Sequence, residues 1–164
     1  MADGGASTFI LLVTALLVSS SVSIVLINQW GDMSSAIEDD RRGKEADTKT
    51  SVSFAGDAME VEYDDSVSPN SMTFYLQNTG QYVLDESTLV VVVDGASVTS
   101  TISSTIVPSG TVWNDVKLLK VVVNSSSWTY QNNDGVSLSV VVSSDVTSGF
   151  RGTDSLNLEV RLDV

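Results

Sequence analysis

Cysteine and histidine are both absent from the 164 residues of this chain. Without cysteine, disulfide bonds and thiolate chemistry are excluded. Without histidine, imidazole sites for zinc or copper are excluded, and nucleophilic catalysis lacks its commonest base. Basic residues are also scarce, since 8 Lys and Arg face 21 Asp and Glu, which gives a net charge of −13. Nucleic acid is not expected as a partner, because binding it requires clustered basic side chains.

Motifs that bind phosphates, dinucleotides or an acyl group are also missing from the sequence. Acidic pairs occur at Asp39-Asp40, Asp64-Asp65 and Asp85-Glu86, and such short charge runs are typical of solvated turns and faces. We therefore predict that the chain is no enzyme and needs no cofactor. A calcium site built from carboxylates near Asp64-Asp65 or Asp134 remains open as an alternative.

An uncharged segment from Gly4 to Gly31 is the most distinctive feature that is present. Residues 1–7 form a short leader or N-terminal cap, and Thr8–Trp30 is mostly apolar. These 23 residues predict a helix of about 34 Å, enough to cross a hydrocarbon core of roughly 30 Å. A secretory signal peptide is the alternative. Such a peptide usually has a basic residue before its apolar run, whereas no Lys or Arg precedes the run here.

Small residues form a stripe along this helix. Ala15, Ser19 and Ser23 are spaced four residues apart, so they share one helix face. Small side chains let helices approach closely, which favours packing against other helices. The alternative is a single spanning helix that tolerates its serines.

The helix is expected to continue as an extension over residues 31–49. Apolar residues recur at helical spacing through Met33 and Ile37, and acidic residues precede basic ones by four positions. Gly43 is predicted to end the helix. The basic residues of this segment are Arg41, Arg42 and Lys44. The positive-inside rule would place them in the cytoplasm. That placement conflicts with an exported β domain after the helix.

Residues 50–164 change to a period of two, which is typical of half-buried strands. The alternation is clear at Met72–Leu76, Val136–Val142 and Leu156–Val164. Leu89–Val93 is apolar on both faces, which predicts a central strand, and Asp94-Gly95 after it predicts a tight hairpin. About eight short strands at this spacing predict an all-β, immunoglobulin-like sandwich.

Three features of this β region are candidates for contacts. Asn124 begins the sequon Asn-Ser-Ser and is a candidate for N-glycosylation. Trp113 and Trp128 are aromatic, and we expect at least one of them in the core. The last strand is a candidate for edge pairing with another chain, or else a core strand; its alternating apolar residues are Leu156, Leu158, Val160, Leu162 and Val164.

Three stretches carry a resemblance to a known family. They are the apolar run from Ala6 to Ser19 that continues to Val25-Leu26-Ile27, the strand Ser71–Gly80 that ends in Asn-Thr-Gly, and Val91–Gly95, which ends in Asp-Gly. Together they resemble the archaeal flagellin-like proteins of the archaellum. The resemblance is greater to the branch of flagellar protein G than to the filament subunits.

The resemblance implies a structural protein of the archaeal cell surface. In the first branch, the helix stays in the membrane and a β-sandwich outside the cytoplasm contacts copies of itself, sister archaellum proteins or the surface layer, as a stator. In filament subunits, the helices pack in the filament core after a peptidase cuts behind a basic residue and a glycine. Gly5 is the candidate cut site here, although no basic residue precedes it. A membrane-tethered adhesion or ligand-binding module is the further alternative.

Overall fold

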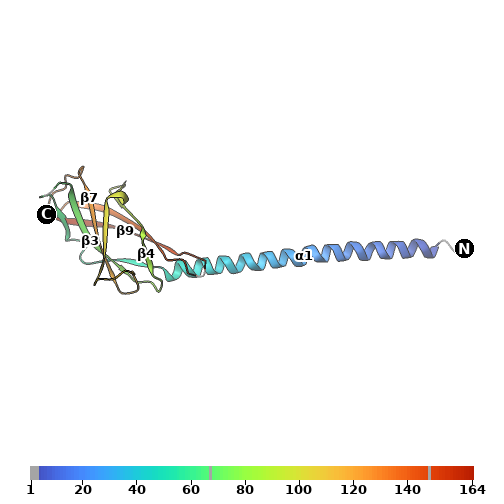
Figure 1. The fold of residues 1–164 in the computed structure, drawn as a ribbon. Helices are drawn as coiled ribbons and strands as arrows, with labels where there is room; N and C mark the ends of the chain where they lie inside the picture. The colour runs from blue at the N-terminus through green and yellow to red at the C-terminus, as the bar shows by residue number, and fades with distance from the viewer. Residues whose placement is uncertain (1–3, 67, 148) are drawn as a thin grey trace. The chain divides into compact units, whose positions relative to one another are not determined.

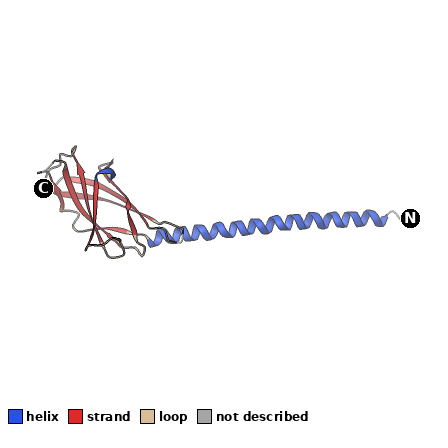
Figure 2. Cartoon of the chain, in the orientation of Figure 1, coloured by secondary structure: helices blue, strands red, loops and turns tan. Residues whose placement is uncertain are grey.

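The computed structural model describes residues 4–66, 68–147 and 149–164. One long helix, α1, precedes nine strands and one short 3-10 helix, η1, in these residues (Figures 1 and 2). The predicted arrangement of an N-terminal apolar helix followed by an all-β region is confirmed. The elements are α1 (Gly4–Lys49), β1 (Val52–Ala55), β2 (Val61–Asp64), β3 (Asn70–Asn78), β4 (Leu84–Val93), β5 (Ala96–Ser97), η1 (Thr99–Thr101), β6 (Ile102–Val107), β7 (Leu118–Ser125), β8 (Gly135–Ser144) and β9 (Thr153–Asp163).

Helix α1 continues past the glycine that was expected to end it. The prediction of an end at Gly43 is wrong, since the helix runs to Lys49. A glycine costs a helix only about 1 kcal/mol relative to alanine, and the next turn is well stabilised. There Ala46 is buried, and the ammonium of Lys49 lies 2.5 Å from the carboxylate of Glu45.

The strands follow the order β5-β4-β8-β9-β2-β3-β7-β6, and β1 pairs beside β2 on the edge of β3. Every pairing between the described strands is antiparallel except that of β2 with β9. The strands predicted from period-two patterns are all present. The predicted hairpin is also confirmed, because Val93 pairs with Ala96 and the residues between them, Asp94 and Gly95, have φ angles of 48° and 79°.

Strand β4 is not the fully buried central strand that its apolar run predicted. Its neighbours are β8 and the two-residue β5. Val91 is buried, whereas Val90 is 39% exposed and Val92 is half-buried. One side of this apolar run therefore lies on the outer face of the domain.

One hydrophobic core fills the β domain, and strands from both ends of the order contribute to it. Met72, Phe74 and Leu76 of β3 point inward together with alternate residues of β4, β7 and β8. Trp113 is 1% exposed and Trp128 is 8% exposed, which confirms that at least one tryptophan lies in the core. The alternation seen in the sequence is thus the alternation between core and solvent.

Backbone and side-chain hydrogen bonds hold the end of α1 to the β domain. The carbonyl oxygen of Lys49 accepts bonds from the backbone N–H groups of Gln81 and Tyr82, at 2.8 and 3.2 Å. The carboxylate of Asp47 accepts the backbone N–H of Thr153 at 3.0 Å. Because these bonds satisfy groups in the last turn of the helix, they join the helix end to the strands, and this contact is the joint.

Two glycines make this joint possible. A Cβ on Gly80 would lie 2.5 Å from the carbonyl oxygen of Lys49, and a Cβ on Gly152 would overlap the backbone of Ala46 and the hydroxyl of Thr50. Neither position has room for a side chain. The joint therefore depends on close approach of bare backbone at two separate positions of the β domain's sequence.

Candidate functional site

The apolar part of α1 exposes hydrophobic side chains around its whole circumference. Every residue from 5 to 37 is exposed in the single chain, with Leu12 at 57%, Leu16 at 62% and Ile27 at 70%. A soluble monomer rarely exposes a continuous apolar patch above roughly 300–600 Å². This helix is long and apolar enough to cross a membrane. Its surface therefore requires either lipid or other apolar helices around it.

The three stripe residues lie on the exposed part of α1. The hydroxyl of Ser23 donates to the carbonyl oxygen of Ser19 at 2.9 Å. Thr14, Ser20 and Ser21 bond carbonyls one turn earlier in the same way. Because these hydroxyls are satisfied within the helix, they impose little cost in an apolar environment. The stripe thus remains compatible with lipid as well as with a neighbouring helix.

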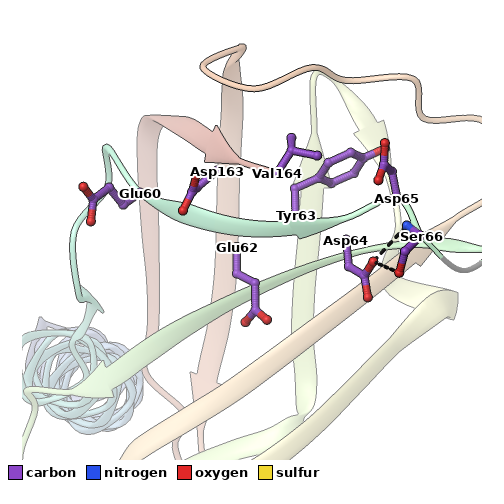
Figure 3. Close-up of a pocket in the computed structure, with 8 residues that line it drawn as sticks. All are labelled: Glu60, Glu62, Tyr63, Asp64, Asp65, Ser66, Asp163 and Val164. Carbon is purple, nitrogen blue, oxygen red and sulfur yellow. Dashed lines mark hydrogen bonds between the residues drawn. The ribbon is translucent and has the colours of Figure 1, made fainter.

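An acidic pocket of about 460 Å³ lies where β2 meets the end of β9 (Figure 3). Its lining is Glu60, Glu62, Tyr63, Asp64, Asp65, Ser66, Asp163 and Val164. The carboxylate of Asp64 accepts bonds from the hydroxyl and then the backbone N–H of Ser66, and these bonds lower the pKa of Asp64. This carboxylate closes a local turn.

The expected calcium alternative gains no support from this geometry. Among residues 4–66, 68–147 and 149–164, no three acidic side chains are grouped so that they could hold a metal ion. The second acidic position proposed for calcium, Asp134, accepts the backbone N–H of Gln131 at 2.8 Å. Both acidic positions therefore stabilise turns of the chain itself.

An aromatic cluster closes the same end of the core. The rings of Tyr63, Trp128 and Tyr130 have centroids 5.7 to 6.5 Å apart. The hydroxyl of Tyr130 donates to the carboxylate of Asp94 at 2.8 Å. Burial, followed by this bond and the charge of Asp94, raises the pKa of Tyr130. The cluster therefore fastens the β4–β5 hairpin to the segment that precedes β8.

A Tyr130→Phe chain tests this fastening. We expect it to lower the free energy of unfolding at neutral pH by about 1 kcal/mol, the usual net value of one hydrogen bond. The folded state favours the neutral phenol, so its stabilisation is full below the ordinary tyrosine pKa of about 10 and is lost as the pH rises above it. Denaturant unfolding at several pH values should show that the free energy of unfolding falls less above that pH in Tyr130→Phe than in the natural chain. Tyr75→Phe, at a more exposed ring, is the control and should change neither quantity.

The sequon lies at the end of β7. Asn124 is half-buried, and its side-chain amide donates to the carbonyl oxygen of Thr101 over 3.5 Å. Ser125 and Ser126 line a shallow pocket beside it. Glycosylation of Asn124 stays a prediction.

The last strand has neighbours on both sides. Strand β9 pairs with β8 from Thr153 to Arg161, and with β2 only at Leu162 and Asp163. Val160 and Leu162 are buried, as the alternative of a core strand predicts. Leu156 and Leu158 are half-buried, and Val164 is 50% exposed. Edge pairing with another chain therefore stays a prediction for the stretch of β9 before its contact with β2.

Reasoning from the sequence missed the residues that build the joint. Gly80 enters the sequence analysis only as the last residue of the Asn-Thr-Gly motif, and Gly152 does not enter it. Nothing in the sequence marks Gly152, since the backbone that it approaches is more than 100 positions away. The Asn-Thr-Gly motif was a usable signal, because its asparagine, Asn78, is fully buried and bonds three other parts of the backbone.

Comparison with known proteins gives one result that covers most of the chain. No curated protein has a sequence similar enough to match it. The family model described as archaeal-type flagellin matches residues 2–151. This range includes the apolar helix and eight of the nine described strands. The chain therefore belongs to the archaeal-type flagellin family.

Proposed function

We propose that this chain is a stator-type component of the archaellum, anchored in the membrane by α1 and active through its β domain outside the cytoplasm. Membership of the archaeal-type flagellin family makes it a structural component of this surface appendage. The observation that carries the finer proposal is the apolar surface of α1, exposed around the whole helix and of membrane-spanning length. The likeness to flagellar protein G supports the same role.

Under this proposal, each part of the chain has a mechanical role. Residues 8–30 hold the membrane, residues 31–49 space the β domain from it, and residues 50–164 contact copies of the chain, sister archaellum proteins or the surface layer. The joint at Lys49 suits this role, because its hydrogen bonds fix the helix end to the strands. Force applied to the β domain is then transmitted to the anchor.

A filament subunit is the second candidate function. The stripe of Ala15, Ser19 and Ser23 favours it, because small residues let helices pack closely in a bundle. In a filament core, the basic residues after the helix also meet no positive-inside conflict. They lie among carboxylates, as in the pair of Arg41 with Glu38 at 2.9 Å.

The experiment that separates the two candidates is intact mass measurement on the protein from its native cells, combined with fractionation. A chain that keeps Met1–Gly5, stays with the membrane and is absent from sheared filaments would support the stator proposal. A chain cut behind Gly5 and found in the filaments would overturn it. The same spectrum reports added glycan mass, which Asn124→Gln should remove.

A Ser19→Leu substitution gives a second, independent distinction. In a lone membrane anchor, leucine is favourable in the apolar core, so we expect membrane attachment and motility to be retained. In a helical bundle, the larger side chain would push helices apart at the stripe, so filament formation would fail. Leu16→Ile, which changes no volume, is the matched control for both assays.

A further inference from the structure

We propose that Asn124 carries an N-linked glycan whose first sugar lies in the pocket beside it and covers the start of the edge strand β6. The inference rests on the proposed placement of the β domain outside the cytoplasm, because N-glycosylation belongs to exported domains. It assigns the glycan a binding surface and a role, which the sequon alone does not.

Both residues that the sequon requires are accessible at the end of β7. The side-chain nitrogen of Asn124 lies 3.5 Å from the carbonyl oxygen of Thr101. This distance is long for an N–H···O hydrogen bond, so the amide is weakly held. The hydroxyl residue of the sequon, Ser126, is exposed. The amide nitrogen is therefore open to a modifying enzyme.

The pocket beside the sequon has the chemistry of a sugar-binding surface. Its volume is about 290 Å³, at the lower end of the range for ligand pockets. Pro69 and Val98 give it apolar surface. Hydroxyl groups, which donate and accept hydrogen bonds as sugars do, come from Ser97, Ser100, Thr101, Ser125 and Ser126. One sugar ring attached to Asn124 thus has hydrogen-bond partners and apolar surface within reach.

The lining of this pocket carries no charge, which selects a neutral ligand. By contrast, five carboxylates line the pocket beside β2. In a chain with 21 acidic residues, an uncharged pocket favours neither a metal ion nor a basic peptide. The pocket is shallow, but a sugar bound covalently to Asn124 is held there at high local concentration. Weak contacts are then sufficient to keep the sugar in place.

The start of β6 is the part of the β domain that this glycan covers. Among the described strands β6 pairs with β7 alone, and its residues Ile102–Val107 carry no charge. Open edges are usually protected by charged residues, proline or a bulge. Near the middle of β6, the hydroxyl of Ser104 donates to the carboxylate of Glu86 at 3.3 Å. Asn124 lies beside Thr101, just before β6 begins, so a bulky, solubilising glycan there protects the uncharged start of the edge.

The attachment itself is a group transfer from a lipid-linked sugar donor. The side-chain nitrogen of Asn124 bonds to the anomeric carbon of the sugar, and the bond from that carbon to the phosphate of the donor lipid breaks. The nitrogen loses one proton, and the lipid phosphate leaves. A separate transferase catalyses this step, so it requires no catalytic residue in this chain. The amide hydrogen that remains on Asn124 can still donate to the carbonyl oxygen of Thr101.

Intact-mass and glycopeptide analysis of the full chain from its native cells tests the attachment. Ser126→Ala removes the hydroxyl that the sequon requires and leaves the Asn124 side chain in place. We expect the natural chain to carry glycan mass on Asn124 and Ser126→Ala to carry none. Ser125→Ala, at the unrestricted middle position of the sequon, is the matched control and should keep the glycan. A natural chain without a glycan on Asn124 would overturn the proposal.

Hydrogen exchange of the same chains in detergent tests where the glycan lies. We expect the amides of residues 99–103 to exchange about fivefold faster in Ser126→Ala than in the natural chain, the equivalent of one net hydrogen bond. Ser125→Ala should match the natural chain. The amides of β8, which pairs with neither β6 nor β7, should exchange equally in all three. Equal exchange of residues 99–103 with and without the glycan would show that the sugar points into solvent, and would overturn the proposed binding surface.

Fractionation of the same cells keeps this test separate from the proposed function. Membrane-bound chain without a glycan on Asn124 would overturn the inference alone. Chain recovered in filaments with the glycan present would overturn the stator proposal alone.

Discussion

Replacing Gly152 by alanine is expected to destabilise the β domain by about 3 kcal/mol, at the upper end of the cost of overpacking. The added methyl group would meet the carbonyl carbon of Ala46 at 2.5 Å and would lie closer still to its oxygen and to the hydroxyl of Thr50. Neither the helix backbone nor Thr50 can move away cheaply, because the hydroxyl of Thr50 donates to the Ala46 carbonyl at 2.8 Å. Denaturant unfolding of the full chain in detergent, followed by near-ultraviolet circular dichroism, measures the loss.

The matched control for this prediction is Gly43→Ala on the same helix. A Cβ at Gly43 has no atom within 4 Å, so alanine there should stabilise the helix by up to about 1 kcal/mol. If Gly152→Ala unfolded at the same denaturant concentration as the natural chain, the close approach of the backbone at the joint would be wrong.

The second large effect is expected at Asn78. Its side-chain amide donates to the carbonyl oxygens of Tyr82 and Trp113 at 2.8 and 2.9 Å, and its side-chain oxygen accepts the N–H of Gly80 at 2.9 Å. Asn78→Leu removes all three bonds at a fully buried position. We expect a loss of about 3 kcal/mol, because buried polar groups left without partners each cost about 1–3 kcal/mol.

Gln77→Leu, at the adjacent and partly exposed position, separates this effect from general disturbance of β3. It should change the free energy of unfolding by no more than about 0.5 kcal/mol, as surface substitutions usually do. Equal losses in the two variants would show that the network around Asn78 is not what stabilises the joint.

Most of the secondary structure could be predicted because burial follows the periods of the two regular structures. The helix was marked by an uncharged run. Strand β8 was marked by strict alternation between core and solvent, and β3 by the same alternation except that Thr73 is buried as well. The continuation of α1 past Gly43 could not be predicted, because it depends on the packing of Ala46 against strands that are distant in the sequence. Local propensity contains no information about that contact.

The apolar run of β4 also shows what local sequence does not predict. Leu89–Val93 predicted burial on both faces, since an apolar residue carries no mark of the side on which it lies. The structure leaves Val90 partly exposed because its side chain lies on the outer face of β4, opposite the buried Val91. Hydrophobicity therefore located the strand but not its place in the sheet, and the exposed face became visible only when the strands were arranged.

The pairing of β2 with β9 means that the β domain completes its fold only after the last strand has been synthesised. Val61, near the start of the β domain, pairs with Leu162, and the side chains of Val160 and Leu162 complete the core. A pairing between residues about 100 positions apart forms late, because a long loop must close first. Helix α1 leaves the ribosome before any strand, so an anchor of the proposed kind would insert while the strands that follow are still extended. An export machinery that accepts only unfolded chains would thus receive this domain before it could close.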